Sequence, residues 1–251
     1  MIFFISDLHL SPRSPGATAL FLRFLAGRAR QAEALYILGD LFEVWVGDDI
    51  DDPYAARIAA ALREAGEAGL KIAFMHGNRD FAIGEQFAAA AGMALLPDPY
   101  LLVLPEWSFV LSHGDALCLD DHAYMAYRAK VRDPAWQRKM RAKPRILRSL
   151  LGRYIRWRSA RRKRSENYVY ADLNGPATDD FLRENGYATF IHGHTHRPEK
   201  HDHIVDGIHV ERWVLADWHE ERAEALRWDG DGLKREAITE LSPVCSKPSP
   251  A

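Results

Sequence analysis

Five short segments of this chain carry side chains that can bind a metal ion, most of them beside glycine. In chain order they are Asp7-Leu8-His9, Gly39-Asp40, Gly77-Asn78-Arg79-Asp80, His113-Gly114-Asp115 and Gly193-His194-Thr195-His196. Carboxylate, imidazole and amide groups bind divalent ions, and glycine lets the backbone bend so that adjacent side chains point the same way. One such segment is common by chance, because an aspartate often caps a helix instead. The ordered set of five predicts a metal centre.

Each segment follows a short apolar run of strand length. These runs are residues 2–5, 35–38, 72–75, 109–111 and 188–191. Helical spacing fills residues 18–30 and 55–68 between them, so strands alternate with helices and a largely parallel, buried sheet is expected. The carboxyl ends of parallel strands open on one crevice. Segments spread from position 7 to position 196 can therefore meet in one site.

Three more strands are expected near the carboxyl terminus, at residues 208–215, 223–228 and 232–237. They lie close together without helices between them, which predicts an antiparallel second sheet. The expected fold class is α/β, a two-sheet β-sandwich flanked by helices, with one domain over residues 1–241. Residues 242–251 are rich in proline and serine and predict a flexible tail.

Composition excludes several classes of protein. Of 251 residues, 47% are hydrophobic, which is too many for a disordered chain. Only Cys118 and Cys245 are present, so neither a disulfide framework nor a cysteine-based zinc site is available. No apolar run is long enough to span a bilayer, and the first residues lack the basic segment of a signal peptide. A cytoplasmic protein is expected.

The formal net charge of −2 conceals a strong asymmetry. Residues 130–164 contain fifteen of the 33 basic residues and a single acidic residue, Asp133. The rest of the chain therefore holds 18 basic and 34 acidic residues. Such a partition indicates an anionic partner for the basic stretch.

The basic stretch belongs to a longer interruption, residues 122–170, which separates two motif-bearing strands and predicts a helical insertion. One expected helix face is apolar and the other is basic. The apolar face would carry Leu147, Leu150, Leu151, Tyr154 and Ile155, and the basic face Arg148, Arg153, Arg156 and Arg158. Alternatively, the apolar stripe only docks on the body while the arginines face solvent.

Together the five segments resemble the signature of the calcineurin-like metallophosphoesterases: D-x-H, G-D, G-N-x-[DE], H-G-[DH] and G-H-[TS]-H. The resemblance implies two metal ions with Asp40 as the bridging ligand. It assigns Asp7, His9, Asp40 and His196 to one ion, and Asp40, Asn78, His113 and His194 to the other. This ligand set suits manganese, iron or zinc better than magnesium or calcium. Two divalent cations also carry more charge than the two aspartates neutralise, so the site attracts a phosphate.

The residue type of Arg79 limits which kind of phosphate bond the site is expected to cleave. Many phosphomonoesterases of this superfamily have histidine at that position, where it can protonate an alkoxide leaving group. An arginine does not give up its proton, but its planar guanidinium can grip a phosphate. Loss of the proton donor matters little when the leaving group is itself a phosphate, whose second pKa is about 6. Arg79 therefore favours cleavage of a P–O–P link.

Longer stretches resemble one branch of the superfamily, the UDP-2,3-diacylglucosamine pyrophosphatases of lipid A biosynthesis. They are residues 21–27, 36–43, 76–81, 113–115, 120–121, 127–131, 172–174 and 192–198. The resemblance implies Mn²⁺-dependent hydrolysis of UDP-2,3-diacylglucosamine to UMP and 2,3-diacylglucosamine 1-phosphate, with water attacking the α-phosphorus. Asp40 and Arg79 would be catalytic. Implied substrate contacts are Asn78, Arg79, Asp121, Ser159, Lys163, Glu166 and His194. Glu166 stands where this branch typically has lysine, so neighbouring Arg162 or Arg164 is the alternative.

The basic insertion predicts peripheral association with the anionic cytoplasmic face of the inner membrane. Three other interpretations compete with the pyrophosphatase. The first is a metallophosphodiesterase or phosphatase of the same superfamily that acts on another nucleotide or phosphoester. The second is a nucleic-acid-binding protein, which the acidic remainder and the lack of a nucleic-acid-binding motif argue against. The third is an inactive scaffold, which would lack ligands, whereas none is missing.

Overall fold

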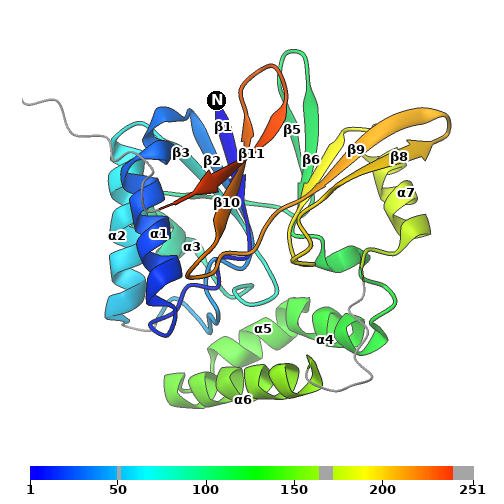
Figure 1. The fold of residues 1–251 in the computed structure, drawn as a ribbon. Coiled ribbons are helices and arrows are strands. Elements are labelled where there is room, and N and C mark those ends of the chain that lie inside the picture. Colours follow the sequence, from blue (N-terminus) through cyan, green and yellow to red (C-terminus); the bar gives the residue numbers. More distant parts are fainter. Residues whose placement is uncertain (50–51, 164–171, 240–251) are drawn as a thin grey trace, which may run out of the picture.

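The computed structural model describes residues 1–49, 52–163 and 172–239. Two sheets face each other, with helices α1 (Pro15–Ala26), α2 (Pro53–Glu67) and α3 (Glu85–Ala91) outside one of them and helix α7 (Gly175–Glu184) outside the other (Figure 1). A third group of helices lies along one edge of this sandwich: α4 (His122–Arg132), α5 (Pro134–Arg141) and α6 (Arg145–Lys163). The expected two-sheet sandwich flanked by helices is therefore confirmed.

The first sheet has the strand order β11-β10-β1-β2-β3-β4. Its bounds are β1 Ile2–Ile5, β2 Ala34–Leu38, β3 Lys71–Met75, β4 Ala94–Leu96, β10 Ala223–Trp228 and β11 Leu233–Ile238. Strands β1 to β4 run parallel to one another, as expected. Strand β10 runs antiparallel to both of its neighbours, β1 and β11. All four residues of β1 are buried because helices cover one face of this sheet and the second sheet covers the other.

The second sheet has the order β5-β6-β7-β9-β8. Its strands are β5 Tyr100–Val103, β6 Ser108–Ser112, β7 Thr189–His192, β8 Lys200–Val205 and β9 Ile208–Val214. The prediction of an antiparallel second sheet is wrong in two respects. This sheet is mixed, since β6, β7 and β9 are parallel. Strands β10 and β11 join the first sheet, because β10 pairs with the free edge of β1 and buries Leu226 and Trp228 between the sheets.

Helices on the outer faces complete the core. They are α1 Pro15–Ala26, α2 Pro53–Glu67, α3 Glu85–Ala91 and α7 Gly175–Glu184, with short 3₁₀ helices at Arg28–Gln31 and Asp115–Leu117. Phe21 and Phe24 of α1 pack edge-on against Trp218, and Phe24 also meets Phe3 of β1. Proline in the first turn of α1, α2 and α7 favours helix initiation.

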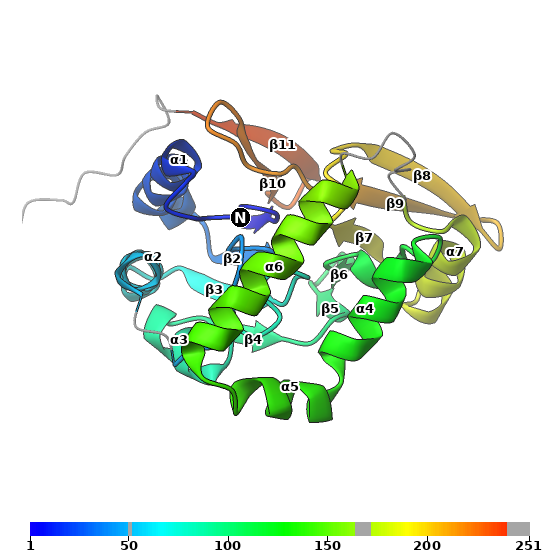
Figure 2. The same ribbon diagram turned by 90° about the horizontal axis from the view of Figure 1, so that it is seen from below.

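The interruption between β6 and β7 contains three consecutive helices, α4 His122–Arg132, α5 Pro134–Arg141 and α6 Arg145–Lys163. Aspartates cap the first two, since Asp121 accepts from the Tyr124 N–H and Asp133 from the Ala135 N–H. Helix α6 passes in front of the strand ends when the molecule is seen from below (Figure 2). None of the described helices has the length and apolar character needed to cross a bilayer.

The faces of α6 differ from the prediction. Leu147, Leu150 and Tyr154 are about half exposed, whereas Leu151 and Ile155 turn toward the body. Arg148, expected on a basic face, is 2% exposed. Its guanidinium is buried because it bonds to the body, so one side of α6 carries a buried charge and the other carries exposed apolar groups. The side chains of Arg156 and Arg158 lie outside the described residues.

Candidate metal centre

The five predicted segments meet beyond the carboxyl ends of β1, β2, β3, β6 and β7. Positive φ angles turn the candidate ligands inward. They occur at Asp7, His9, Asp40, His194 and His196. Position 77 needs glycine because the backbone there lies close to Asp40, and a Cβ would be 2.1 Å from Asp40 Oδ1. Sheet topology and local backbone geometry together bring these side chains into one site.

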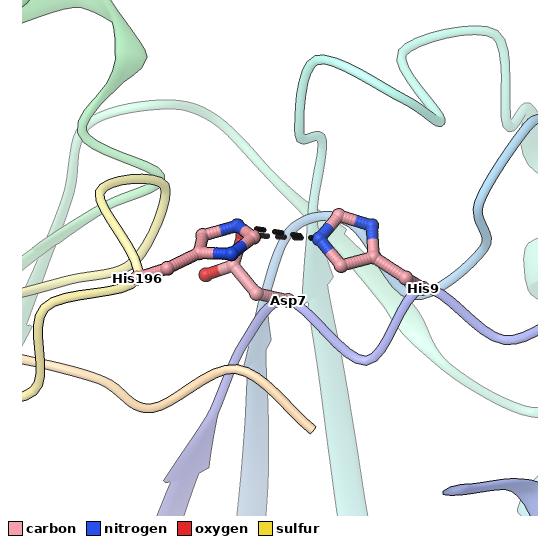
Figure 3. A group of neighbouring side chains, drawn as sticks. All are labelled: Asp7, His9 and His196. Atoms are coloured by element: carbon pink, nitrogen blue, oxygen red, sulfur yellow. Dashed lines mark hydrogen bonds and ion pairs between the residues drawn. The ribbon is translucent and has the colours of Figure 1, made fainter. Parts of the chain in front are cut away.

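Asp7, His9 and His196 form the first half of the site (Figure 3). The Nε2 atoms of the two histidines are 3.3 Å apart, and His196 Nε2 lies 3.3 Å from Asp7 Oδ1. Asp7 is held in place through its other oxygen, Oδ2, which accepts hydrogen bonds from Ser6 Oγ and the His194 N–H. Its Oδ1 is thereby left facing the two imidazoles.

His113, His194 and Asn78 form the second half. Asn78 Oδ1 lies 3.0 Å from His113 Nε2 and 2.9 Å from His194 Nδ1. The rings of His113 and His194 meet edge to face, with centroids 5.1 Å apart. His113 is oriented from behind, where its Nδ1 lies 2.8 Å from the Leu38 carbonyl oxygen. A neutral ring that donates from Nδ1 presents a lone pair on Nε2 toward the site.

Asp40 lies between the two halves. Its Oδ2 is 3.8 Å from His9 Nδ1, and its Oδ1 is 3.8 Å from His113 Nε2. The Arg79 N–H donates to Oδ1. Asp80 fixes the surrounding backbone, since its carboxylate accepts hydrogen bonds from the Asp40, Leu41 and Gly77 N–H groups. This buried carboxylate joins the β2 loop to the β3 loop and holds Asp40 at the centre.

The protonation of the histidines depends on the carboxylates around them. Burial alone would lower the pKa of His113, but Asp40, Asp7 and Asp115 together raise it to about 9. Burial opposes the charged form of His196 as well, yet bonds to Asp217 and Asp7 raise its pKa to about 10. His194 differs, because burial and the neighbouring His113 lower its pKa to about 4. In the metal-free protein these neighbours therefore favour the protonated forms of His113 and His196 at neutral pH.

The donor set fits divalent metal ions. Two groups each place three ligand atoms within 4.8 Å of one another: Asp7, His9 and His196, and Asp7, Asp40 and His113. Asp7 Oδ1 and His9 Nδ1 are buried and form no hydrogen bond of regular geometry among the described residues. Their nearest polar neighbours are His196 Nε2 and Glu43 Oε2, each at 3.3 Å, and a cation between the ligands would satisfy the buried carboxylate oxygen better. Mixed imidazole and carboxylate ligands are typical of transition-metal sites.

A cavity of about 940 Å³ opens over these groups. His9, Asp40, Asn78, Arg79, Asp121 and His194 all line it. Arg79 Nη1 lies 3.5 Å from Glu43 Oε1, and Glu43 Oε2 lies 3.3 Å from His9 Nδ1. The Arg79 guanidinium is therefore held at the edge of the candidate ligands. Among the predicted contacts, Ser159 and Lys163 lie in α6 without described side chains, and Glu166 lies outside the described residues.

Sequence reasoning missed residues that hold the ligands from behind. Asp217 Oδ2 lies 3.0 Å from His196 Nδ1, which leaves His196 Nε2 for the site. Arg212 is buried and lies 3.2 Å from His192 Nε2, while His192 Nδ1 lies 2.8 Å from the Gly193 carbonyl. This pair supports the loop that carries His194. Asp217 follows the end of β9, so the rule that found Asp7 would also have found it.

Two comparisons with known proteins agree with this geometry. The family model described as calcineurin-like phosphoesterase matches residues 1–198. A UDP-2,3-diacylglucosamine hydrolase of Aromatoleum aromaticum is 48% identical over 91% of this chain and 93% of the relative. Proteins of the same name from Ectopseudomonas mendocina and Chromohalobacter salexigens are 44% and 43% identical over 97% and 92% of the chain, and over 100% and 94% of their own lengths. The chain belongs to the calcineurin-like phosphoesterase family.

Proposed function

We propose that this protein hydrolyses the pyrophosphate bond of UDP-2,3-diacylglucosamine to give UMP and 2,3-diacylglucosamine 1-phosphate. The relatives named above supply the substrate, and the cavity carries the proposal. Its lining includes the candidate metal ligands and Arg79, which suit a diphosphate. The apolar half of the lining suits acyl chains: Val44, Val46, Phe81, Trp136, Met140, Leu151 and Ile155. The stretch 122–170 would act as a cap, because its helices provide part of the apolar lining.

Two metal ions, Mn²⁺ in our proposal, would occupy the site described above. Asp7, His9, Asp40 and His196 would hold one ion, and Asp40, Asn78, His113 and His194 the other. The position of Asp40, with one oxygen toward His9 and the other toward His113, supports a bridging role. Such a pair supplies Lewis acidity and a water molecule of lowered pKa for attack on phosphorus.

The chain's own residues orient the substrate. Arg79 is placed to hold a phosphate oxygen, because Glu43 and Asp40 lie 3.5 and 3.9 Å from its guanidinium nitrogens. Asp121 lines the same cavity. The Tyr124 ring lies 5.4 Å from the His194 ring, centroid to centroid, and closes that side of the cavity. No acid is needed for the leaving sugar phosphate, because its second pKa is about 6.

The outer side of the cap supports binding to an anionic membrane surface. Exposed apolar side chains of α6 include Ile146, Leu150 and Trp157, at 76%, 53% and 56% exposure. Arg138, Lys139, Arg141 and Lys143 are exposed on and just after α5. Apolar groups beside clustered basic groups are typical of helices that bind a lipid surface. We infer peripheral attachment to the cytoplasmic face of the inner membrane.

The test is release of UMP from UDP-2,3-diacylglucosamine by the full chain with Mn²⁺, with Mg²⁺ and with EDTA. We expect release with Mn²⁺, none with EDTA, and none from Asp40→Ala protein with Mn²⁺. UDP-glucose serves as a control substrate without acyl chains and should be cleaved poorly. Cleavage of a generic phosphodiester with no cleavage of the lipid would show that the metal site is right and the substrate is wrong.

A further inference from the structure

Helix α6 contributes one wall of the cavity, and it meets the body at the loop that follows Asp40. Leu151 and Ile155 of α6 line the apolar half of the cavity, as do Val44 and Val46 of that loop, and Gly152 of α6 lies directly against Val46. The width of the apolar half therefore depends on how α6 is held against residues 44–49. Arg148, one turn before Gly152, lies at this contact.

The Arg148 guanidinium is satisfied by the loop and by the start of its own helix. Nη1 donates to the Val46 carbonyl at 2.7 Å, and Nε donates to the Lys143 carbonyl at 3.1 Å. Nη2 donates to the Asp49 carboxylate. Arg145 adds a weaker contact, 3.4 Å from the same carboxylate. A guanidinium that is 2% exposed needs such partners, because an unpaired buried charge is unstable.

Two glycines let the helix and the loop approach this closely. A Cβ on Gly47 would lie 2.2 Å from Arg148 Nη1, and a Cβ on Gly152 would lie 2.8 Å from Val46 Cγ1. Neither position has room for a larger side chain while α6 stays where it is. The close contact therefore depends on a glycine in the loop and on a glycine in the helix.

The loop itself is fixed to the body. Asp48 accepts hydrogen bonds from the Gly84 and Phe87 N–H groups at the start of α3, and from Trp45 Nε1. The Trp45 N–H donates to the Arg79 carbonyl at 3.1 Å. The Trp45 ring also packs on Phe87, with ring centroids 4.6 Å apart. Arg148 thus fastens a helix with exposed apolar groups to a rigid support that also contacts Arg79.

We propose that Arg148, through Asp49 and Val46, is a positioning residue that sets the apolar half of the cavity and so determines affinity for acylated substrates. This inference rests on the proposed function for the identity of the substrate. It predicts that Arg148 acts on KM for a substrate with acyl chains. A water-soluble phosphodiester does not occupy the apolar half, so its hydrolysis does not depend on Arg148.

The test compares Arg148→Met with Arg153→Met in the full chain. Methionine keeps the apolar stem and removes the guanidinium, and Arg153 is an exposed arginine of the same helix with the same charge change. Both variants are assayed with UDP-2,3-diacylglucosamine in detergent micelles and with bis(p-nitrophenyl) phosphate. Hydrogen–deuterium exchange of α6 is measured alongside. Asp49→Asn provides a second variant that removes the charge partner, whose side chain is half exposed.

For Arg148→Met we expect KM for the lipid to rise about tenfold with kcat within about twofold, as for lost uniform binding. The soluble diester should be cleaved as by wild type, and α6 amides should exchange faster. Arg148→Lys should restore part of the affinity, because an ammonium can reach one of the partners. Asp49→Asn should change KM in the same direction by less.

Wild-type KM and exchange in Arg148→Met would overturn the proposal. Equal loss on both substrates would also overturn it, because the defect would then lie at the metal site. If wild-type protein leaves the lipid intact but cleaves the soluble diester, the proposed function fails. In that case hydrogen–deuterium exchange of α6 still tests whether Arg148 positions the helix. Unchanged exchange in Arg148→Met would show that it does not.

Discussion

Charged groups are held in opposite ways in the sandwich and in the helical insertion. In the sandwich, Asp7, Asp40 and His113 are almost fully buried and are fixed by backbone donors and carbonyls of neighbouring loops. In the insertion, Val131 and Arg148 are the buried residues among the side chains described between positions 122 and 163. Basic and apolar groups there mostly face solvent.

The cavity has two requirements, precise metal ligands and an apolar wall, and each region meets one of them. Metal ligands must be placed to within fractions of an ångström, and buried networks on strand ends provide that precision. A wall for flexible acyl chains needs shape and apolar area more than exact geometry, and a helix fastened through one buried arginine can provide both. If the two regions are as independent as this contrast implies, a change in one should leave the other unaffected.

The largest effect is expected in the sandwich. Asp40→Asn should lose bound Mn²⁺ and reduce activity by at least about 10³-fold, because this carboxylate faces both halves of the site. Metal content of the dialysed protein measures the first effect. Asp202→Asn is the matched control, since its side chain is 56% exposed on β8. Full metal content in Asp40→Asn would remove Asp40 from the ligand set.

A pH effect should follow from the same region. The pKa values of His113 and His196 are raised to about 9 and about 10 in metal-free protein, so both rings hold protons at pH 7. Metal binding requires neutral rings and must displace these protons. Apparent Mn²⁺ affinity should therefore fall as pH drops from 9 to 7, by up to about 100-fold per pH unit for two protons. Calorimetry in buffers of different ionisation enthalpy counts the protons released, and zero release would contradict the prediction.

A smaller effect is expected one step behind the ligands. Asp217→Asn weakens the hold on His196 Nδ1 and should lower Mn²⁺ affinity by about tenfold while the fold is retained. Titration followed by electron paramagnetic resonance of free Mn²⁺ measures this change. His219→Gln provides the comparison, because His219 contacts the same carboxylate but is 59% exposed. Equal losses in both variants would indicate a general change of that loop.

The smallest effect belongs to the insertion. Replacing Leu150 and Trp157 with glutamine should weaken binding to anionic vesicles severalfold, because losing this partly buried apolar area costs about 1 kcal/mol of binding free energy. Activity in micelles should be unchanged. Co-sedimentation with vesicles measures the binding. Ile204→Gln changes an even more exposed apolar residue, on β8, and should have no effect. Reduced activity in micelles would show that the two regions are coupled through α6.

The sequence could predict that the candidate ligands in the sandwich lie close together, because each of them follows a strand. Asp7 and Asp40 need only their own strands and the rule that parallel strands of one sheet end at one edge. His113 follows β6 of the second sheet, so its approach to Asp40 also depends on how the two sheets face each other. The partners of β10 and β11 could not be predicted that way. Which sheet a strand joins depends on the free edge of β1, and no local pattern encodes that edge.

The insertion was predictable as helix but not in its orientation. Helical spacing groups Leu147 and Leu150 with Leu151, yet α6 exposes the first two and turns the third inward. Charged residues usually face solvent, so nothing in the local sequence indicated that Arg148 is buried. Its burial depends on Val46 and Asp49, which are about one hundred positions away.

Left-handed backbone at five candidate ligands has a consequence for attempts to stabilise this chain. Each such residue costs about 1 kcal/mol relative to glycine, because its Cβ crowds the carbonyl oxygen. Glycine would relieve that cost but would remove the candidate ligand, and at Asp7 and Asp40 it would also leave the His194 and Arg79 N–H groups without their acceptors. A laboratory screen that scores only melting temperature would therefore not protect the side chains on which the site depends.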